Sequence, residues 1–288
     1  MDTTELLKKV RRIEIKTKGL SNHIFSGDYN TAFKGRGMSF SEVREYQYGD
    51  DIRDIDWNVT ARFSHPYIKI FEEERELSVM LLVDVSKSSL FGTNEQRKKD
   101  LITEMCAVLA FSAISNNDKV GAIFFSNQIE KYIPPKKGKS HILLIIRQLL
   151  SLEPKGTGTD IGEALRFFNN ANKKKSIVFL ASDFLASGYE HALTLASRKH
   201  DLIGIHVYDQ RDRNLPDVGM IKMMDSESGI EQWVDTSNKA IRKYYTDKFE
   251  EHRQYCKEAF MKSRAELLSM HTGQDYVKAL RGFFKKRI

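Results

Sequence analysis

The sequence has 288 residues, enough for one large domain or two small ones with a sizeable buried core. Hydrophobic residues make up 41% and charged residues 30%, which excludes the composition of a disordered chain. The net charge of +7 is compatible with nucleic acid or anionic lipid as a partner, but 39 acidic residues lie among the 46 basic ones. Charge alone therefore does not predict a nucleic-acid-binding protein.

No apolar run approaches the roughly 20 residues of a membrane-spanning helix, and the first residues lack the apolar core of a secretory signal. The two cysteines, Cys106 and Cys256, lie in helix-like segments without a CxxC motif or a His-rich neighbour. They predict reduced core thiols, since neither a zinc site nor a disulfide framework has this pattern. We expect a cytoplasmic protein with no membrane span.

Residues 1–75 form the first region of the chain, with an amphipathic helix near 3–17 followed by Gly- and charge-rich sequence. We expect this region to pack onto the domain that follows. In its segment 35–62 we expect three arginines to pair with the neighbouring acids and Trp57 to anchor the segment onto the domain. A catalytic metal held by the acids is the alternative. The charged and aromatic residues in question are Glu42, Arg44, Glu45, Asp50, Asp51, Arg53, Asp54, Asp56, Trp57 and Arg62.

Residues 76–288 alternate between short apolar, β-branched runs and helical patterns. Strands are predicted at 77–85, 119–126, 128–133, 176–182, 202–209 and 265–272, and helices near 96–115, 139–151, 160–170, 189–198, 238–262 and 275–287. Such alternation predicts an α/β fold with a doubly wound, mostly parallel sheet flanked by helices, as in Rossmann-like domains.

The stretch 218–236 alternates apolar and polar residues around a Ser-Glu-Ser-Gly turn, which predicts a β-hairpin inserted into this domain. Its Met220, Met223, Met224 and Trp233 are expected to pack in the ordinary way. The alternative is a second contact surface.

Polar side chains gather where predicted strands end. Asp84, Ser86 and Ser88 form an Asp-x-Ser-x-Ser pattern after the first strand of the domain. Thr159 lies in the loop GTGTD before a helix, and Asp183 follows the strand SIVFLAS. Ligands of open α/β sheets bind at the carboxyl edge, where these positions should meet.

The predicted donors are two carboxylates and three hydroxyls, all oxygen. This set suits a hard cation such as Mg²⁺, with Mn²⁺ or Ca²⁺ as alternatives, and argues against zinc or copper. We expect the three hydroxyls to bind the ion directly and the two aspartates to act partly through water. A carboxylate from another protein could then fill the open position.

Each of these residues also has a purely structural explanation. Asp84 and Ser86 could cap a turn, and Asp183 could be an ordinary turn residue. Thr159 or Asp160 could begin the next helix, with Glu163 completing a capping box. Their joint occurrence in the right order favours the metal site.

The five residues resemble the metal-ion-dependent adhesion site of von Willebrand factor A domains. Asp84, Ser86 and Ser88 match its first motif, Thr159 its threonine and Asp183 its last aspartate. A wider resemblance covers almost the whole chain. The segments GRGMSFSEVREYQYGDDIRDIDWNVTAR, PYIKIFEEERELSVMLLVDVS and GTDIGEAL are similar to the bacterial family called domain of unknown function 58.

That resemblance implies a partner as well as a fold. Members of this family are commonly encoded beside MoxR-type AAA+ ATPases, so it implies a non-enzymatic adaptor or co-chaperone that binds such an ATPase or its client. Many members carry membrane segments upstream, and none is found in this sequence.

Two other classes of function are weaker. A hydrolase or phosphotransferase would use Asp84 as a nucleophile, but the sequence has no GxxxxGK[ST], HExxH or GxSxG motif, and His206 fits a packed strand residue better than a base. A nucleic-acid-binding protein would use the basic N-terminal helix, but no known binding module accompanies it.

Overall fold

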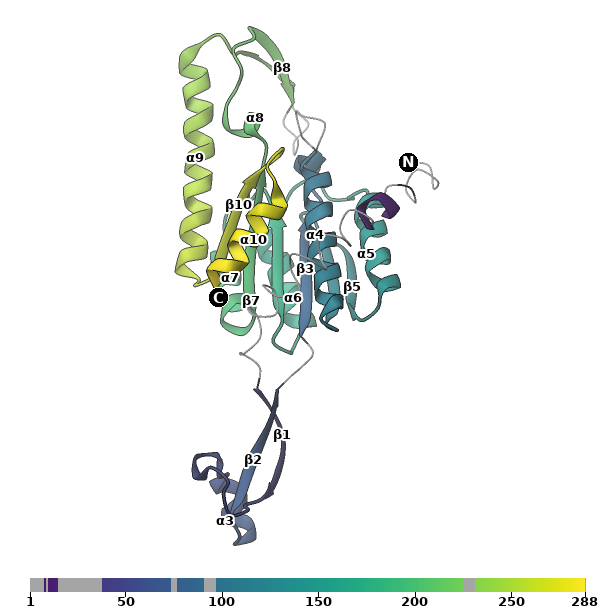
Figure 1. Cartoon of the computed structure of the whole chain (residues 1–288). Helices are drawn as coiled ribbons and strands as arrows, with labels where there is room; N and C mark the ends of the chain where they lie inside the picture. The colour runs from purple at the N-terminus through teal and green to yellow at the C-terminus, as the bar shows by residue number, and fades with distance from the viewer. Residues whose placement is uncertain are drawn as a thin grey trace.

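The computed structural model describes residues 8, 10–14, 38–73, 77–90, 97–224 and 231–287 (Figure 1). Its first elements in chain order are β1 (Met38–Glu45), η2 (Ile52–Asp54), α3 (Trp57–Phe63), β2 (Tyr67–Glu73), β3 (Ser78–Asp84), η3 (Lys87–Leu90), α4 (Lys98–Ser115), β4 (Lys119–Phe125), β5 (Ile129–Lys136) and α5 (Lys139–Ser151). The chain continues with α6 (Ile161–Ala171), β6 (Ile177–Ser182), α7 (Glu190–Lys199), β7 (Asp201–Tyr208), α8 (Gln210–Arg213), β8 (Met220–Met224), β9 (Glu231–Asp235), α9 (Lys239–Lys262), β10 (Glu266–His271) and α10 (Tyr276–Arg287).

The main domain is built on a six-stranded sheet of order β10-β7-β6-β3-β4-β5. Five strands are parallel, and only the edge strand β5 is antiparallel, to β4. The predicted α/β fold with a mostly parallel, helix-flanked sheet is confirmed. Because β3 lies at the centre of this order, its carboxyl end meets those of β4 and β6.

Helices cover both faces of this sheet, which gives the domain two hydrophobic layers. Helices α4, α5 and α10 pack on one face and α6, α7 and α9 on the other. Successive residues of β3 alternate between the layers, with Leu81 and Val83 in the first and Met80 and Leu82 in the second. This two-sided burial explains why the strand sequence is a continuous apolar run.

The N-terminal region divides into two parts that behave differently. Residues 10–14 are helical and pack on the first layer through Val10 and Ile13, as expected. Residues 38–73 instead form an arm, in which β1 pairs antiparallel with β2 and α3 lies at the tip. Figure 1 shows this arm extending away from the six-stranded sheet, at the end opposite to β8. The expectation that the whole region packs on the domain is wrong for the arm.

Ion pairs within the arm satisfy several of its charges locally, and among the described residues they confirm the predicted pairing for Arg44 and Arg53 but not for Arg62. Arg44 donates two hydrogen bonds of 2.8 and 2.7 Å to Asp50, and Arg53 pairs with Asp51 at 2.8 Å, as predicted. Trp57 is 70% exposed, so its predicted role as an anchor on the domain is wrong. The reason is that β1 and β2 separate the tip of the arm, where Trp57 lies, from the hydrophobic core of the domain (Figure 1).

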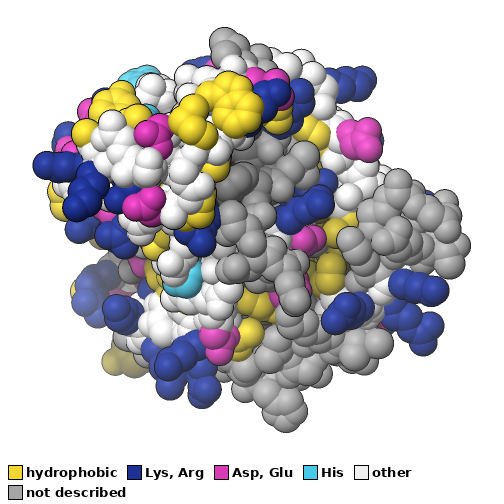
Figure 2. All heavy atoms as spheres, turned by 90° about the horizontal axis from the view of Figure 1, so that it is seen from above, with side chains coloured by type: hydrophobic (Ala, Val, Ile, Leu, Met, Phe, Trp, Pro, Cys, Tyr) yellow, Lys and Arg dark blue, Asp and Glu magenta, His cyan; other side chains and the backbone are white. Residues whose placement is uncertain are grey.

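The predicted β-hairpin forms from β8 and β9, although residues 225–230 lie outside the described part. Met220, Met224 and Trp233 are exposed and Met223 is half-buried, so ordinary packing was the wrong expectation for the first three. A two-stranded ribbon has no second layer above it, and alternate side chains must face solvent. Hydrophobic groups are visible on this end of the molecule, where basic and acidic side chains are interspersed (Figure 2).

Cys106 and Cys256 are free and buried, as predicted. His206 is also buried, inside β7 and stacked on Tyr208, which fits the expected packing role. Among the described residues, no helix has the length and hydropathy needed to cross a membrane.

Gly204 in β7 lies against the Phe260 ring of α9. A Cβ added there would overlap the Phe260 ring and come within 2.8 Å of Leu267 Cδ1. Gly204→Ala is therefore expected to lower the free energy of unfolding by about 1–3 kcal/mol, which is the usual cost of overpacking a core.

Gly282, exposed in α10 with no atom within 4 Å of its added Cβ, provides the matched control. Gly282→Ala should stabilise by about 0.5–1 kcal/mol because alanine favours helix. Thermal unfolding followed by circular dichroism measures both, and equal effects would contradict the packing argument.

Candidate cation-binding site

The five predicted site residues come together at the carboxyl edge of the sheet. Asp84 ends β3 and Asp183 directly follows β6, and these two strands are parallel neighbours. Ser86 and Ser88 lie in the turn after β3, and Thr159 lies in the loop that leads into α6. The sheet order thus brings together three segments that are far apart in sequence.

Asp84 is the centre of the hydrogen-bond network and is 3% exposed. Its Oδ1 accepts from the Ser86 backbone N–H at 2.9 Å. Its Oδ2 accepts from the hydroxyls of Ser182 at 2.7 Å and Thr159 at 3.3 Å. Burial and the nearby charge of Asp183 raise the pKa of Asp84 to about 6. A buried carboxylate whose ionisation is opposed in this way gains strongly from a nearby cation.

The two serines connect Asp84 to Asp183. The Ser86 and Ser88 hydroxyls lie 3.0 Å apart, and the Ser88 hydroxyl hydrogen-bonds the Asp183 carboxylate. Asp160, next to Thr159, instead caps α6 by accepting from the Glu163 N–H at 2.8 Å. The capping explanation therefore applies to Asp160, while Thr159 faces Asp84.

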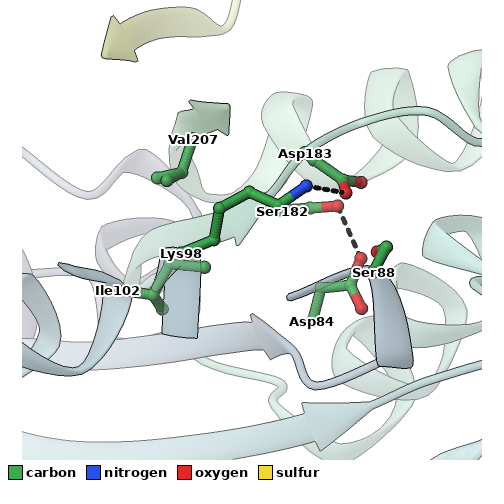
Figure 3. Close-up of a pocket in the computed structure, with 7 residues that line it drawn as sticks. All are labelled: Asp84, Ser88, Lys98, Ile102, Ser182, Asp183 and Val207. Atoms are coloured by element: carbon green, nitrogen blue, oxygen red, sulfur yellow. Dashed lines mark hydrogen bonds and ion pairs between the residues drawn. The ribbon is translucent and has the colours of Figure 1, made fainter. Parts of the chain in front are cut away.

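Lys98 is a site residue that the sequence did not reveal. Its ammonium donates to Asp183 Oδ2 at 3.0 Å and to Asp212 Oδ2 at 3.1 Å, and its side chain is 2% exposed. Burial acts to lower the pKa of Lys98, but the charges of Asp183 and Asp212 outweigh it and raise that pKa above its usual range. Burial likewise acts against ionised Asp183, and the Lys98 ammonium nevertheless holds the pKa of Asp183 below its usual value. Figure 3 shows the ammonium pointing at Asp183.

One sequence signal could have found Lys98. It is the first residue of α4, where the helix dipole disfavours a cation. A lysine at that position calls for a local anion to compensate, and the two aspartates provide it. In the sequence, however, Lys98 stands between Arg97 and Lys99 and resembles a solvated surface residue.

Two further residues position the predicted donors. Ser182, the last residue of β6, donates to Asp84 and accepts from the Phe184 N–H at 3.0 Å. Glu130 fixes the loop that carries Thr159, because one carboxylate oxygen accepts from the Gly156 N–H at 2.8 Å and the Ser126 hydroxyl at 2.6 Å. Ser182 could have been found in the sequence, because it is a hydroxyl residue directly before Asp183. No comparable feature of the sequence marks Glu130.

One left-handed residue lies in the turn directly after Asp183. Phe184 has a φ of 52°, a left-handed conformation that non-glycine residues rarely adopt. Its buried ring packs edge-to-face on Phe260 with centroids 5.2 Å apart. Tertiary packing thus holds the sharp turn that follows Asp183, as is common at functional sites.

The donor chemistry fits a hard divalent cation. Ser86, Ser88 and Thr159 offer neutral oxygens, and Asp84 and Asp183 offer negative ones, which are the ligands of Mg²⁺. Within the described residues no group of three or more His, Cys, Asp or Glu side chains is arranged to hold a metal. A pocket at this edge is lined by three of the five donors, Asp84, Ser88 and Asp183, together with Lys98, Ile102, Ser182 and Val207 (Figure 3).

The sheet order, the helices on both faces and the hydroxyl-rich carboxyl edge define an α/β domain of von Willebrand factor A type. Residues 42–255 match the family described as "Protein of unknown function DUF58", and the chain belongs to that family.

Uncharacterized mycobacterial proteins are similar to this chain over its full length. An uncharacterized protein of Mycobacterium tuberculosis is 29% identical over 290 residues, covering 100% of this chain and 91% of its own. Among solved structures, an aerotolerance-related membrane protein of Bacteroides fragilis superposes with a TM-score of 0.52 at 17% identity, over 73% of this chain and 99% of its own. The "SpRpn10 VWA domain" gives a TM-score of 0.40 at 12% identity, over 71% and 94%. The similarity to the Bacteroides fragilis structure concerns the fold alone.

Proposed function

We propose that this protein is a non-catalytic binding module in which a divalent cation, Mg²⁺ first, recruits an acidic group of a partner protein. The observation that supports this most directly is the convergence of two buried aspartates and three hydroxyls from three separate segments. Every donor is an oxygen, and Asp84 contacts hydroxyls and a backbone N–H.

The neutral and the charged residues of the site have different proposed roles. Ser86, Ser88 and Thr159 would place neutral hydroxyl oxygens on the ion. Asp84 and Asp183 orient those hydroxyls and would hold the water of the ion. When bound, the ion supplies a Lewis-acidic position that a carboxylate of another protein can occupy.

The proposed partner is a MoxR-type AAA+ ATPase or a client that is delivered to it. Support for this comes from the family whose model matches residues 42–255, because its members are commonly encoded beside such ATPases. The proposed setting is cytoplasmic. A partner that presents a glutamate or aspartate on an exposed loop would meet the requirement of the site.

The partner can be tested by affinity capture from native lysate of the source bacterium, with tagged wild type, Asp84→Asn and Asp160→Asn, each with Mg²⁺ and with EDTA. We expect wild type to retain a MoxR-type ATPase or its client only with Mg²⁺. Asp84→Asn should lose the partner in both buffers because the central carboxylate of the site is gone. Asp160→Asn is the matched control, since it changes a carboxylate next to Thr159 that caps α6 and keeps a capping side chain.

A partner retained equally in EDTA, or by Asp84→Asn, would contradict the proposal. Raising the salt concentration separates this binding from nucleic-acid binding. Phosphate contacts release counterions and weaken steeply with salt, while a desolvated carboxylate on a bound cation should be much less sensitive.

A further inference from the structure

Lys98 brings a third carboxylate into the environment of the candidate site. Asp84 and Asp183 belong to the site itself, and Asp212 is tied to Asp183 through the shared ammonium. Asp212 is held in place from its other side, because its Oδ2 also accepts from the Asp209 N–H at 2.8 Å. Asp209 in turn accepts from the Thr272 hydroxyl at 2.5 Å. The lysine is therefore fixed between two aspartates whose own positions are fixed.

The formal charges of this group have a simple consequence. With Asp84, Asp183 and Asp212 ionised, these three carboxylates and the Lys98 ammonium sum to −2, which a divalent cation brings to zero. Asp209 is also buried and adds the same charge to every variant compared below. Without the ammonium the same group would carry −3, and a divalent cation would leave it at −1. The more negative the loaded site is, the more strongly it repels the carboxylate of a partner, so the ammonium favours an acidic ligand.

We propose that the Lys98 ammonium acts as a permanent counter-cation of this site, which weakens divalent-cation binding and makes the loaded site less negative toward an acidic ligand. This inference rests on the proposed function. Lys98 does not have to touch the ion to act in this way. Its ammonium lies 3.0 Å from Asp183 Oδ2. Because the surroundings are buried and have a low effective dielectric constant, the positive charge of Lys98 still acts on a cation at the site.

Wild type, two single variants and their double variant together separate the effect of net charge from the effect of altered structure. Lys98→Met removes the positive charge and keeps an unbranched side chain of similar length, giving −3. Asp212→Asn removes a negative charge outside the donor set, giving −1. The double variant Lys98→Met/Asp212→Asn returns the group to −2, the value of wild type. All three leave the donors Asp84, Ser86, Ser88, Thr159 and Asp183 unchanged.

The experiment is a titration of each full-length protein with Mn²⁺, in which electron paramagnetic resonance counts the free ion. We expect Lys98→Met to bind Mn²⁺ about tenfold more tightly than wild type and Asp212→Asn about tenfold more weakly, as a unit charge at close range predicts. The double variant should bind within about threefold of wild type. Because it is charge-balanced, it also tests the idea if Lys98→Met alone fails to fold: Asp212→Asn must then bind more weakly than the double variant.

The outcomes distinguish this inference from the proposed function. If wild type binds Mn²⁺ and the four affinities do not follow the net charge, the role of Lys98 is refuted while the cation site stands. If wild type binds none and Lys98→Met does, Lys98 suppresses binding as inferred and the proposed cation-dependent function fails. Absence of binding in all four proteins overturns both.

Discussion

Saturating Mg²⁺ is expected to raise the melting temperature of the wild-type chain by about 5–10 °C, and Asp84→Asn should abolish this increase. A ligand present at about 100 times its Kd stabilises the native state by about 2.7 kcal/mol. For a chain of this size each kcal/mol corresponds to about 2–4 °C. The increase is lost in the variant because a neutral amide replaces the carboxylate at the centre of the site.

In EDTA the same substitution should cost little stability. Asp84 is buried, and its raised pKa means that its ionised form is disfavoured in the folded state. The asparagine amide can donate to Ser182, and its carbonyl can still accept from the Ser86 N–H. Loss of the Mg²⁺ effect without loss of the fold separates ligand binding from structure.

The control for Asp84→Asn is Asp118→Asn. Asp118 is a second buried aspartate, but it lies at the opposite edge of the sheet, where it accepts from the Leu77 N–H at 2.9 Å. This variant should keep the full Mg²⁺ increase even if its own stability changes. A wild-type chain whose melting temperature is the same in Mg²⁺ and in EDTA would argue against a cation site.

The fold could be predicted because burial leaves a regular trace in the sequence. Runs such as residues 79–83 are apolar throughout because both faces of β3 are covered. The convergence of Asp84 and Asp183 was predictable for a related reason, since neighbouring parallel strands end at the same edge. Thr159 followed from its place in the loop before α6.

Other features were not predictable, because the same residue types occur in several environments. Trp57 on the arm and Trp233 on the β8–β9 hairpin are exposed, although tryptophan is usually well buried. Lys98 is the opposite case, a lysine in a basic stretch that is nearly inaccessible. Its two aspartates lie 85 and 114 positions away, and only the tertiary structure brings them to its ammonium.

Lys98→Met should be among the most destabilising single substitutions outside the hydrophobic core when no cation is present. It leaves Asp183 and Asp212 buried without the ammonium that both contact. Removing one partner from a buried ion pair costs about 3–5 kcal/mol, because the remaining charge is uncompensated. Thermal unfolding in EDTA should show a decrease of about 10 °C.

Asp212→Asn added to Lys98→Met should recover part of this loss, because one of the two unpaired carboxylates is then neutral. Alone, Asp212→Asn should cost much less than Lys98→Met, since Lys98 keeps its contact with Asp183. The two substitutions share one ammonium, so their effects should not add, and a double-mutant cycle measures the coupling. Additive effects, or a Lys98→Met variant within about 1 kcal/mol of wild type, would show that the ammonium does not stabilise these carboxylates. Mg²⁺ should restore more stability to Lys98→Met than to wild type, because the ion then offsets charge that Lys98 no longer balances.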